Sequence, residues 1–281
     1  MKALPRAVHG LRASRRMSQA VDGFHVVAQE SGFTGRSLPT WACRRPGNVK
    51  FICADEAPKA SLRSLEHVAR GCFQILDVLA PSECEQLIRI TEQMGYDEDA
   101  PVSLPHSFRH MQNVNWIADA SVAAQVWSRA APALPEEARE VAPGAEALGL
   151  NARFRCYRYA ADDYFKPHTD GSWPGSLVVD GKLVCDAFGD RWSQYTFLLL
   201  LSGDYEGGRT VFMVDGKQNA VRTPQGGALC FPHGGHPLHA VHAGELVTSG
   251  HKYMVRTEIL YRRTAASDAL QAPWIAQGSK L

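Results

Sequence analysis

Two residues that could bind a metal ion stand two positions apart, His168 and Asp170 in the segment 164–171. In an extended strand, residues i and i+2 point to the same face, so this imidazole and this carboxylate could reach one cation. A second histidine would complete a two-histidine, one-carboxylate set, which leaves positions open and suits Fe(II) and oxygen chemistry. Taken alone, His-x-Asp equally fits a histidine at a strand end followed by a turn-forming aspartate.

A histidine-rich tract offers the second histidine. Its candidates are His233, His236, His239 and His242. A helix with a histidine stripe is disfavoured by Gly234, Gly235 and Pro237, and a metal-binding tract at the surface is another interpretation. We expect His242 to be the ligand, because the residues after it read as strand, turn and strand, with the reversal at 248–250.

Lys252 supports this choice. It lies 10 residues after His242, enough for two short strands and a tight turn to bring it back near the metal. A lysine buried there needs an anionic partner, and the distal carboxylate of 2-oxoglutarate would supply one. Arg256 shares a face with Lys252 on an extended strand, and it could either assist or form a structural salt bridge.

The elements that would position these residues are mostly strands. Short apolar or alternating runs separated by turns indicate a sandwich or barrel. The predicted strands cover 152–160, 193–202, 209–214, 226–232 and 252–262, with an earlier one over 72–79.

Two helices are expected before this strand-rich half. Ser82 and Glu85 have the spacing of a capping box, which predicts a helix start there. A second helix is predicted over 121–131, with Asp119 or Ser121 as its cap. The fold class is therefore mostly β with flanking helices.

Composition narrows the class of protein. The chain has 281 residues, 45% hydrophobic and 21% charged, with a net charge of +1, as in ordinary globular proteins. This charge gives no basic field, so nucleic acid is not expected as a partner. No run approaches the roughly 18 apolar residues of a membrane span, so no membrane association is expected.

The compartment is inferred from the cysteines and the first residues. Seven scattered cysteines without a Cys-x-x-Cys pair favour free thiols in a reducing compartment, hence the cytoplasm. Residues 1–21 contain five basic residues and no acidic one, which favours a mitochondrial transit peptide as the alternative. A basic tail, or a true start at Met17, would explain the same bias.

Three stretches of the chain, in this order, resemble the prolyl 4-hydroxylase-like branch of the Fe(II)/2-oxoglutarate-dependent dioxygenases. They are 159–170, 196–210 and 242–261. The resemblance covers about residues 70–262 and implies a double-stranded β-helix core, the jelly roll also found in cupins. It also implies an oxygenase that hydroxylates an unactivated C–H bond of a peptidyl residue or a small molecule, with release of succinate and CO2.

The resemblance implies roles residue by residue. The Fe(II) ligands are His168, Asp170 and His242. The residues that bind 2-oxoglutarate are Lys252, Tyr159 and Thr196, with Arg256 as a further candidate. O2 is the other cosubstrate, and ascorbate is included as an additional reductant. No catalytic residue beyond the metal ligands is implied.

The chain departs from the family pattern at two places. Residues 160–163 replace a glycine-rich turn, and Arg209 stands where Gly-Gly-Glu-Thr has glutamate. Neither change removes a ligand, and Arg209 is a candidate for altered substrate selectivity. Asp170 is retained, which argues against the halogenase variant.

The resemblance does not identify the substrate. The candidates for binding it are Arg109, Arg155, Trp173 and Arg191. The competing interpretation is packing for the tryptophan and solvation or surface pairing for the arginines. No oligomeric state is predicted.

Two alternative functions are disfavoured by the sequence. A catalytically silent jelly-roll binding or sensing module is disfavoured by the intact ligand set and Lys252. A nucleic-acid demethylase of the same superfamily is disfavoured by the near-neutral charge and by the lack of paired arginines after the distal histidine.

The expected organisation follows from these assignments. Residues 1–65 would be a basic, partly disordered tail and irregular lead-in. The dioxygenase domain would cover 66–265, and 266–281 would be a C-terminal tail.

Overall fold

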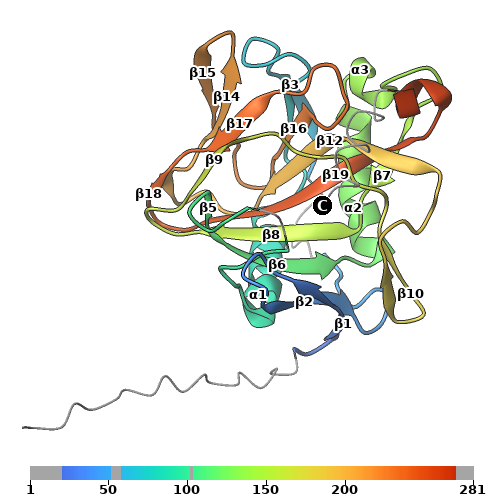
Figure 1. The fold of residues 1–281 in the computed structure, drawn as a ribbon, viewed down its shortest axis with the longest axis vertical. Coiled ribbons are helices and arrows are strands. Elements are labelled where there is room, and N and C mark those ends of the chain that lie inside the picture. Colours follow the sequence, from blue (N-terminus) through green and yellow to red (C-terminus); the bar gives the residue numbers. More distant parts are fainter. Residues whose placement is uncertain (1–20, 52–57, 102–103, 270–281) are drawn as a thin grey trace, which may run out of the picture.

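The computed structural model describes residues 21–51, 58–101 and 104–269 (Figure 1). Residues 1–20, which are all but the last residue of the segment 1–21 considered as a transit peptide, lie outside the described residues, as do most of the C-terminal residues 266–281. None of the described helices has the length and apolar character needed to cross a membrane.

Most of the regular structure belongs to two sheets, which confirms the predicted fold class. In sheet order, the ten-stranded sheet contains β1 (Phe24–Ser31), β2 (Ser37–Cys43), β6 (Gln112–Ile117), β8 (Arg153–Tyr159), β19 (Lys252–Arg262), β12 (Arg191–Leu200), β16 (Ala228–Pro232), β4 (Phe73–Leu76) and β3 (Ser61–Ser64), and β7 (Ala147–Leu150) pairs with β19. The five-stranded sheet contains β15 (Lys217–Val221), β14 (Thr210–Val214), β17 (Val241–Gly244), β9 (Tyr164–His168) and β5 (Arg109–His110).

Two strand pairs stand apart from these sheets. They are β10 (Leu177–Val179) with β11 (Lys182–Val184), and β13 (Glu206–Gly207) with β18 (Val247–Ser249).

The central strands form a double-stranded β-helix. In the larger sheet β8, β19, β12 and β16 are neighbours, and in the smaller sheet β15, β14, β17 and β9 are neighbours. Along the chain these eight strands pass back and forth between the two sheets, which is the connectivity of a jelly roll. The strands predicted from alternation, including β8, β12, β14, β16 and β19, lie in this core.

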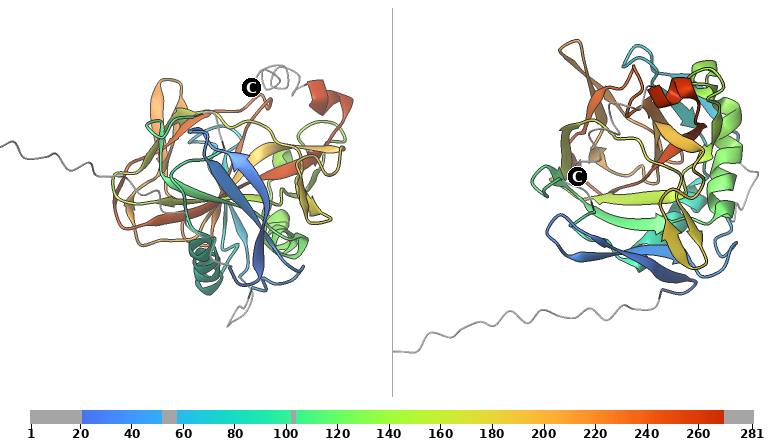
Figure 2. Two further views of the ribbon diagram at one scale, coloured as in Figure 1. Left: turned by 60° about the horizontal axis from the view of Figure 1, so that its bottom comes forward. Right: turned by 45° about the vertical axis from the view of Figure 1, so that its right-hand side comes forward.

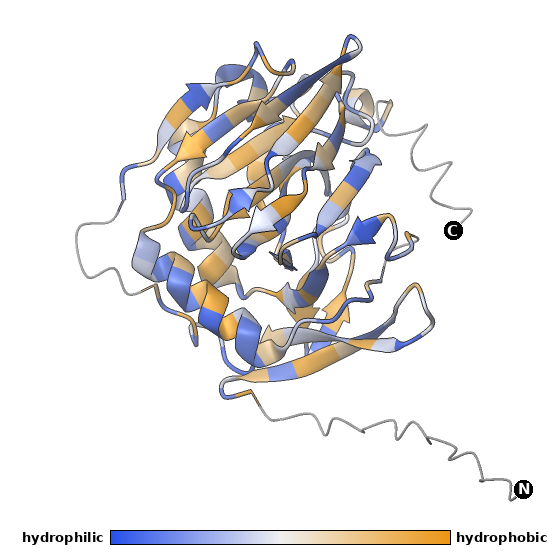
Figure 3. Ribbon diagram, turned by 90° about the vertical axis from the view of Figure 1, so that its left-hand side faces the viewer, coloured by the Kyte–Doolittle hydropathy of each residue, from blue (hydrophilic) through white to orange (hydrophobic). Residues whose placement is uncertain are grey.

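Hydrophilic and hydrophobic residues are interspersed along the strands (Figure 3). In β8, Phe154 and Cys156 belong to one apolar cluster, whereas Tyr157 and Tyr159 belong to another. This period of two separates the outer face of the larger sheet from the space between the sheets. The candidate ligands lie on the inner side.

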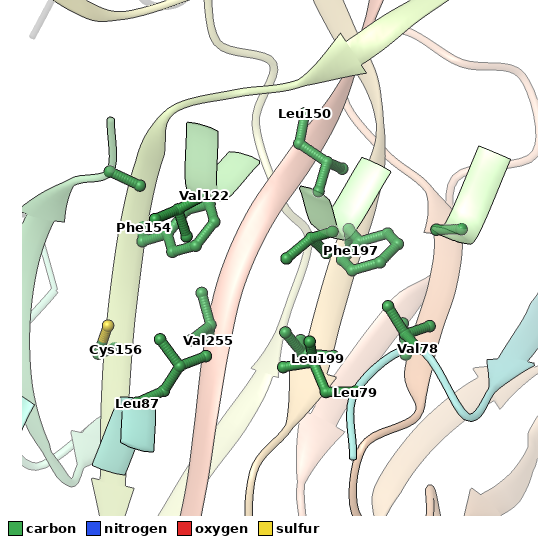
Figure 4. Packing of buried hydrophobic residues seen from close by; sticks show 14 of the residues in the cluster. Val78, Leu79, Leu87, Val122, Leu150, Phe154, Cys156, Phe197, Leu199 and Val255 are labelled. Carbon is green, nitrogen blue, oxygen red and sulfur yellow. The ribbon is translucent and has the colours of Figure 1, made fainter. Parts of the chain in front are cut away.

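Helices α1 (Pro81–Met94) and α2 (Ala120–Ala130) cover the outer face of the larger sheet (Figure 2). Figure 4 shows Leu87 of α1 and Val122 of α2 packed with side chains of that face. The short helices η1 (Ala131–Ala133) and α3 (Glu136–Arg139) follow α2. Burying this apolar face makes the larger sheet a rigid support for the site.

The cap predicted for α1 is wrong by about two residues. The helix begins at Pro81, with Ala80 as its N-cap, and Glu83 rather than Glu85 caps the backbone, in one direction only because the alanine side chain cannot accept. The Glu83 carboxylate accepts a hydrogen bond from Ala80 N–H at 2.8 Å and pairs with Arg129 at 2.7 Å. The proline at the first helical position requires the earlier start. Asp119, in contrast, caps α2 as predicted.

The segment before residue 66 is more regular than the expected irregular lead-in. Strands β1 and β2 form an antiparallel hairpin, and β2 extends the larger sheet by pairing in parallel with β6. Phe24 and Trp41 from this hairpin are buried in the outer core. The division of the chain into one domain with two tails stays a prediction.

Candidate metal centre

The three predicted ligands converge at one point between the two sheets. His168 ends β9, Asp170 follows two residues later, and His242 lies in β17 directly opposite His168. The Nε2 atoms of both histidines lie 3.8 Å from the carboxylate oxygens of Asp170. One donor atom from each residue lies within 4.8 Å of the others. Pairing of β9 with β17 thus brings together residues that are far apart in the sequence.

Backbone contacts orient both imidazole rings. The Nδ1 atom of His168 lies 2.8 Å from the carbonyl oxygen of Lys166, and that of His242 lies 3.3 Å from the carbonyl of Ala240. A carbonyl only accepts, so each Nδ1 carries the proton. Each Nε2 therefore directs its lone pair toward the shared point, as a metal ligand must.

The protonation states suit a cation. Burial lowers the pKa of His168 to about 4 and lowers that of His242 below its usual value. Burial alone would raise the pKa of Asp170, but Arg256 and the neighbouring histidines hold it well below its usual range. Two neutral imidazoles and one carboxylate are the forms that bind a divalent metal.

Thr196 and Arg256 both contact the Asp170 carboxylate. The Thr196 hydroxyl donates to Oδ2 at 2.6 Å, and the Arg256 guanidinium lies 3.2 Å from each oxygen. Both residues were predicted to bind 2-oxoglutarate. Arg256 lines the cavity beside the ligands, whereas Thr196 is not among the residues of its wall.

A hydrogen-bonded chain continues from Thr196 into the larger sheet. His233 Nδ1 lies 2.7 Å from Thr196 Oγ1, and its Nε2 lies 2.8 Å from Ser193 Oγ. Since Thr196 donates to Asp170, it accepts from Nδ1–H, and Ser193 donates to Nε2. Ser193 in turn accepts from the Trp173 backbone N–H at 2.8 Å. Burial lowers the pKa of His233 to about 4, so this chain runs through a neutral imidazole.

Sequence reasoning did not find the role of His233. The residue was visible only as one of four histidines in the tract. Two others are placed elsewhere: the His236 ring lies 5.4 Å from that of Tyr195, and His239 Nδ1 lies 3.0 Å from the His236 carbonyl.

Lys252 and Tyr159 lie in the same cavity as the ligands. Its wall comprises Tyr157, Tyr159, Phe165, His168, Asp170, Leu198, Thr210, His242, Ala243, Gly244, Lys252, Met254 and Arg256. The Lys252 ammonium lies 5.2 Å from the centre of the Tyr159 ring and donates to the carbonyl of Gly208 at 2.7 Å. Thr210, not predicted as a site residue, belongs to the Gly-Gly-Arg-Thr stretch.

Lys252 is a buried cation without a counter-ion. It is 4% exposed and forms no ion pair with any residue that the structure describes. Burial, aided by Arg222, lowers its pKa to about 8. At neutral pH the ammonium is therefore mostly charged, and the free energy of this buried charge favours an anionic ligand.

The four substrate candidates have different surroundings. Arg155 is buried, pairs with Glu258 at 2.6 Å and lies 4.4 Å from the Trp173 ring centre. Arg109 is also buried, with its guanidinium 5.8 Å from the Tyr157 ring centre. Arg191 instead pairs with its neighbour Asp190. None of these arginines is among the described residues that line the cavity, but Arg109 lies against two that do, Tyr157 and Phe165.

Arg209, the departure noted in the Gly-Gly-Arg-Thr stretch, faces outward. It pairs with Glu245 at 2.6 Å, and half of its side chain is exposed. This pairing gives it a surface contact rather than a place in the cavity wall.

Comparisons with known proteins give results at the level of structure. No family model and no curated protein matches the chain. A viral collagen prolyl hydroxylase from Paramecium Bursaria Chlorella virus-1, solved with 2OG, is 18% identical over 69% of this chain and 98% of its own, with a TM-score of 0.45. A Trichoplax adhaerens prolyl hydroxylase, solved with a hypoxia inducible factor fragment, is 15% identical over 72% and 86%, with a TM-score of 0.46.

HygX from Streptomyces hygroscopicus, solved with nickel and 2-oxoglutarate, is 15% identical over 71% of this chain and 85% of its own, with a TM-score of 0.41. Similarity at this level does not transfer an activity.

Proposed function

We propose that this protein is an Fe(II)/2-oxoglutarate-dependent oxygenase. It would hydroxylate an unactivated C–H bond of a peptidyl residue or a small molecule, with release of succinate and CO2. The observation that supports this most directly is the convergence of His168, Asp170 and His242 on the wall of a cavity that also holds the unpaired Lys252.

The donor set fits Fe(II). Two imidazole nitrogens and one carboxylate oxygen converge from one side, and this mixed set with open positions suits a non-haem Fe(II) centre. His168, Asp170 and His242 would hold the ion. Bound Fe(II) would supply O2 activation coupled to oxidative decarboxylation of 2-oxoglutarate.

Lys252 and Tyr159 would hold the far carboxylate of 2-oxoglutarate. Lys252 provides a buried positive charge, and the low-dielectric surroundings strengthen its attraction to a carboxylate. Tyr159 is buried beside it, and burial raises the pKa of its hydroxyl far above the neutral range, so the group stays protonated and can donate. The apolar side chains of Leu198 and Met254 also belong to the wall of this cavity.

Thr196 and Arg256 would position the metal ligand Asp170. Both contact its carboxylate, and contacts of this kind typically change metal affinity or activity by roughly 10–100-fold when removed. Their positions favour this role over direct contact with 2-oxoglutarate for Thr196. Arg256 also lines the cavity, so it could serve both.

The test is a titration followed by a product assay. 2-Oxoglutarate is added without oxygen to protein loaded with Fe(II), and binding is measured by calorimetry. Oxygen is then admitted and succinate is measured. We expect binding that needs the metal, followed by succinate formation without added substrate. Failure of the metal-loaded protein to bind 2-oxoglutarate would reject the proposal, and binding without any succinate would identify the silent binding module instead.

A further inference from the structure

Arg109 is a buried charge at the edge of the cavity. It lies in β5, the outermost strand of the smaller sheet, opposite Phe165 of the cavity wall (Figure 1). The residue is 5% exposed, and an arginine guanidinium stays protonated even when buried. In the part of the chain that the structure describes, its guanidinium lies 5.8 Å from the centre of the Tyr157 ring, and its positive charge opposes the rise in the pKa of the buried Tyr159 hydroxyl. A largely buried charge without an ion-pair partner is stabilised further when an anion binds it.

The other buried arginines of this region already have carboxylate partners. The pairs are Arg153 with Glu30 at 2.6 Å, Arg155 with Glu258 at 2.6 Å, and Arg256 with Asp170 at 3.2 Å. Arg109 differs from them because its side chain forms neither a hydrogen bond nor an ion pair within the described residues. It is therefore free to bind an external anion.

Arg109 and Lys252 lie at different levels of the cavity. On β8, Tyr159 stands opposite Lys252, and Tyr157 stands opposite Met254, one step closer to Arg256. Residues i and i+2 of a strand are roughly 7 Å apart. Arg109 lies over Tyr157, and its charge also acts on Tyr159. It is not among the groups that shift the pKa of Lys252, which are Arg222 and Glu245.

The net charge of the cavity favours binding of a second anion in addition to 2-oxoglutarate. Arg155 and Arg256 are offset by Glu258 and Asp170. Lys252 and Arg109 have no ion-pair partner in the described part of the chain, and a divalent metal would add two positive charges. Two further carboxylates act only at longer range or are already paired: Glu245 acts on Lys252, and Asp163, which acts on Tyr159, pairs with His110. The two carboxylates of 2-oxoglutarate would offset only part of this excess, so a buried positive charge would remain beside the position of the substrate.

From these observations we infer that Arg109 binds a carboxylate of the substrate that is oxidised. The inference rests on the proposed function and narrows its substrate to an acid. A guanidinium binds a carboxylate through two parallel hydrogen bonds. The corresponding neutral amide would leave Arg109 unpaired, so the enzyme should favour the acid by roughly 100-fold or more in kcat/KM.

A first experiment tests the premise without any activity. Arg109→Met removes the charge and keeps a chain of similar length, whereas Arg155→Met breaks the buried pair with Glu258. We expect Arg109→Met to leave the melting temperature of the ligand-free protein equal or higher, and Arg155→Met to lower it. A comparable decrease in both variants would show that Arg109 has a structural partner and would overturn the inference.

A second experiment tests the anion itself. Protein is saturated with Mn(II) and 2-oxoglutarate without oxygen, and the melting temperature is followed on addition of acetate or its neutral counterpart acetamide. Stabilisation by acetate alone is expected in the wild type and in the control Arg191→Gln, and its loss is expected in Arg109→Gln. An equal effect of acetate in wild type and Arg109→Gln would contradict the inference.

The same titrations separate the two carboxylate sources. 2-Oxoglutarate should bind Arg109→Gln as it binds the wild type, whereas Lys252→Ala should lose affinity. If Arg109→Gln loses affinity for 2-oxoglutarate to the same extent, Arg109 belongs to the cosubstrate and the inference is wrong. Failure of the wild type to bind 2-oxoglutarate would instead reject the proposed function.

Discussion

Thr196 donates a hydrogen bond to Asp170 at 2.6 Å while its oxygen lies 2.7 Å from His233. This threonine therefore connects the carboxylate of the candidate metal centre to a neutral histidine buried in the larger sheet. The direction of donation follows from the carboxylate, which can only accept. The contact keeps one Asp170 oxygen oriented by the protein rather than by water.

Replacing Thr196 by valine should weaken metal binding. The substitution keeps the shape but removes the donor to Asp170, and the expected loss of Mn(II) affinity is roughly 10–100-fold by calorimetry. Thr257→Val is the matched control, because the Thr257 hydroxyl is buried but donates to the Asn151 carbonyl away from the ligands. Equal loss in both variants would show a general effect of destabilisation.

His233 and His239 should differ in their effect on activity, although both belong to the same tract. His233→Ala removes the donor to Thr196 and should lower succinate formation and Mn(II) affinity together by roughly 10-fold or more. His239→Ala should retain most of both, since His239 contacts the His236 carbonyl instead. Retention of full metal affinity in His233→Ala would contradict the positioning role.

Lys252→Ala should raise the KM for 2-oxoglutarate more than the KM for the substrate. The reason is the loss of the one buried ammonium beside Tyr159, against which the far carboxylate would bind. Lys252→Arg restores the charge and should recover part of the affinity. Steady-state kinetics with either compound varied provide the measurement, and an equal effect on both KM values would count against this role.

Acid should destabilise the metal-free protein over a defined range. Burial lowers the pKa of His168, His233 and His236 from 6.5 to about 4. Below pH 6.5 the unfolded chain therefore binds more protons than the folded one, so the stability of the folded state decreases as the pH falls toward 4. Denaturant unfolding at several pH values measures the slope, and His233→Gln should reduce it. An unchanged slope in that variant would contradict the buried neutral state of His233.

Local pattern and chain order were sufficient to predict that His168, Asp170 and His242 lie together, whereas their binding of a metal stays a prediction. Alternation identified the central strands, and the strand–turn–strand pattern after His242 distinguished it from three other histidines. The structure brings that residue opposite His168 by pairing β17 with β9. The strands follow from the period of hydrophobic residues, and the choice of His242 follows from the spacing of turn residues after it. Both can be read from the sequence directly.

Other features depend on tertiary contacts and were not predictable in this way. Thr196 lies in β12 of the larger sheet, and Asp170 follows β9 of the smaller sheet. Their hydrogen bond joins the two sheets, and no local sequence pattern predicts it. The N-cap of α1 is Ala80 rather than the predicted Ser82. The capping carboxylate of Glu83 is buried and also pairs with Arg129, 46 residues away in the chain. The strands β1 and β2 were not predicted, because β2 joins the larger sheet by pairing with β6, which is distant in the sequence.

Metal stoichiometry tests the central claim most directly. The wild type and the variants His168→Ala, Asp170→Ala and His242→Ala are dialysed against Fe(II) without oxygen, and bound iron is measured by atomic spectroscopy. We predict one iron per chain in the wild type and almost none in each variant. One iron per chain retained by His242→Ala would contradict the assignment of this residue and, with it, the metal centre described above.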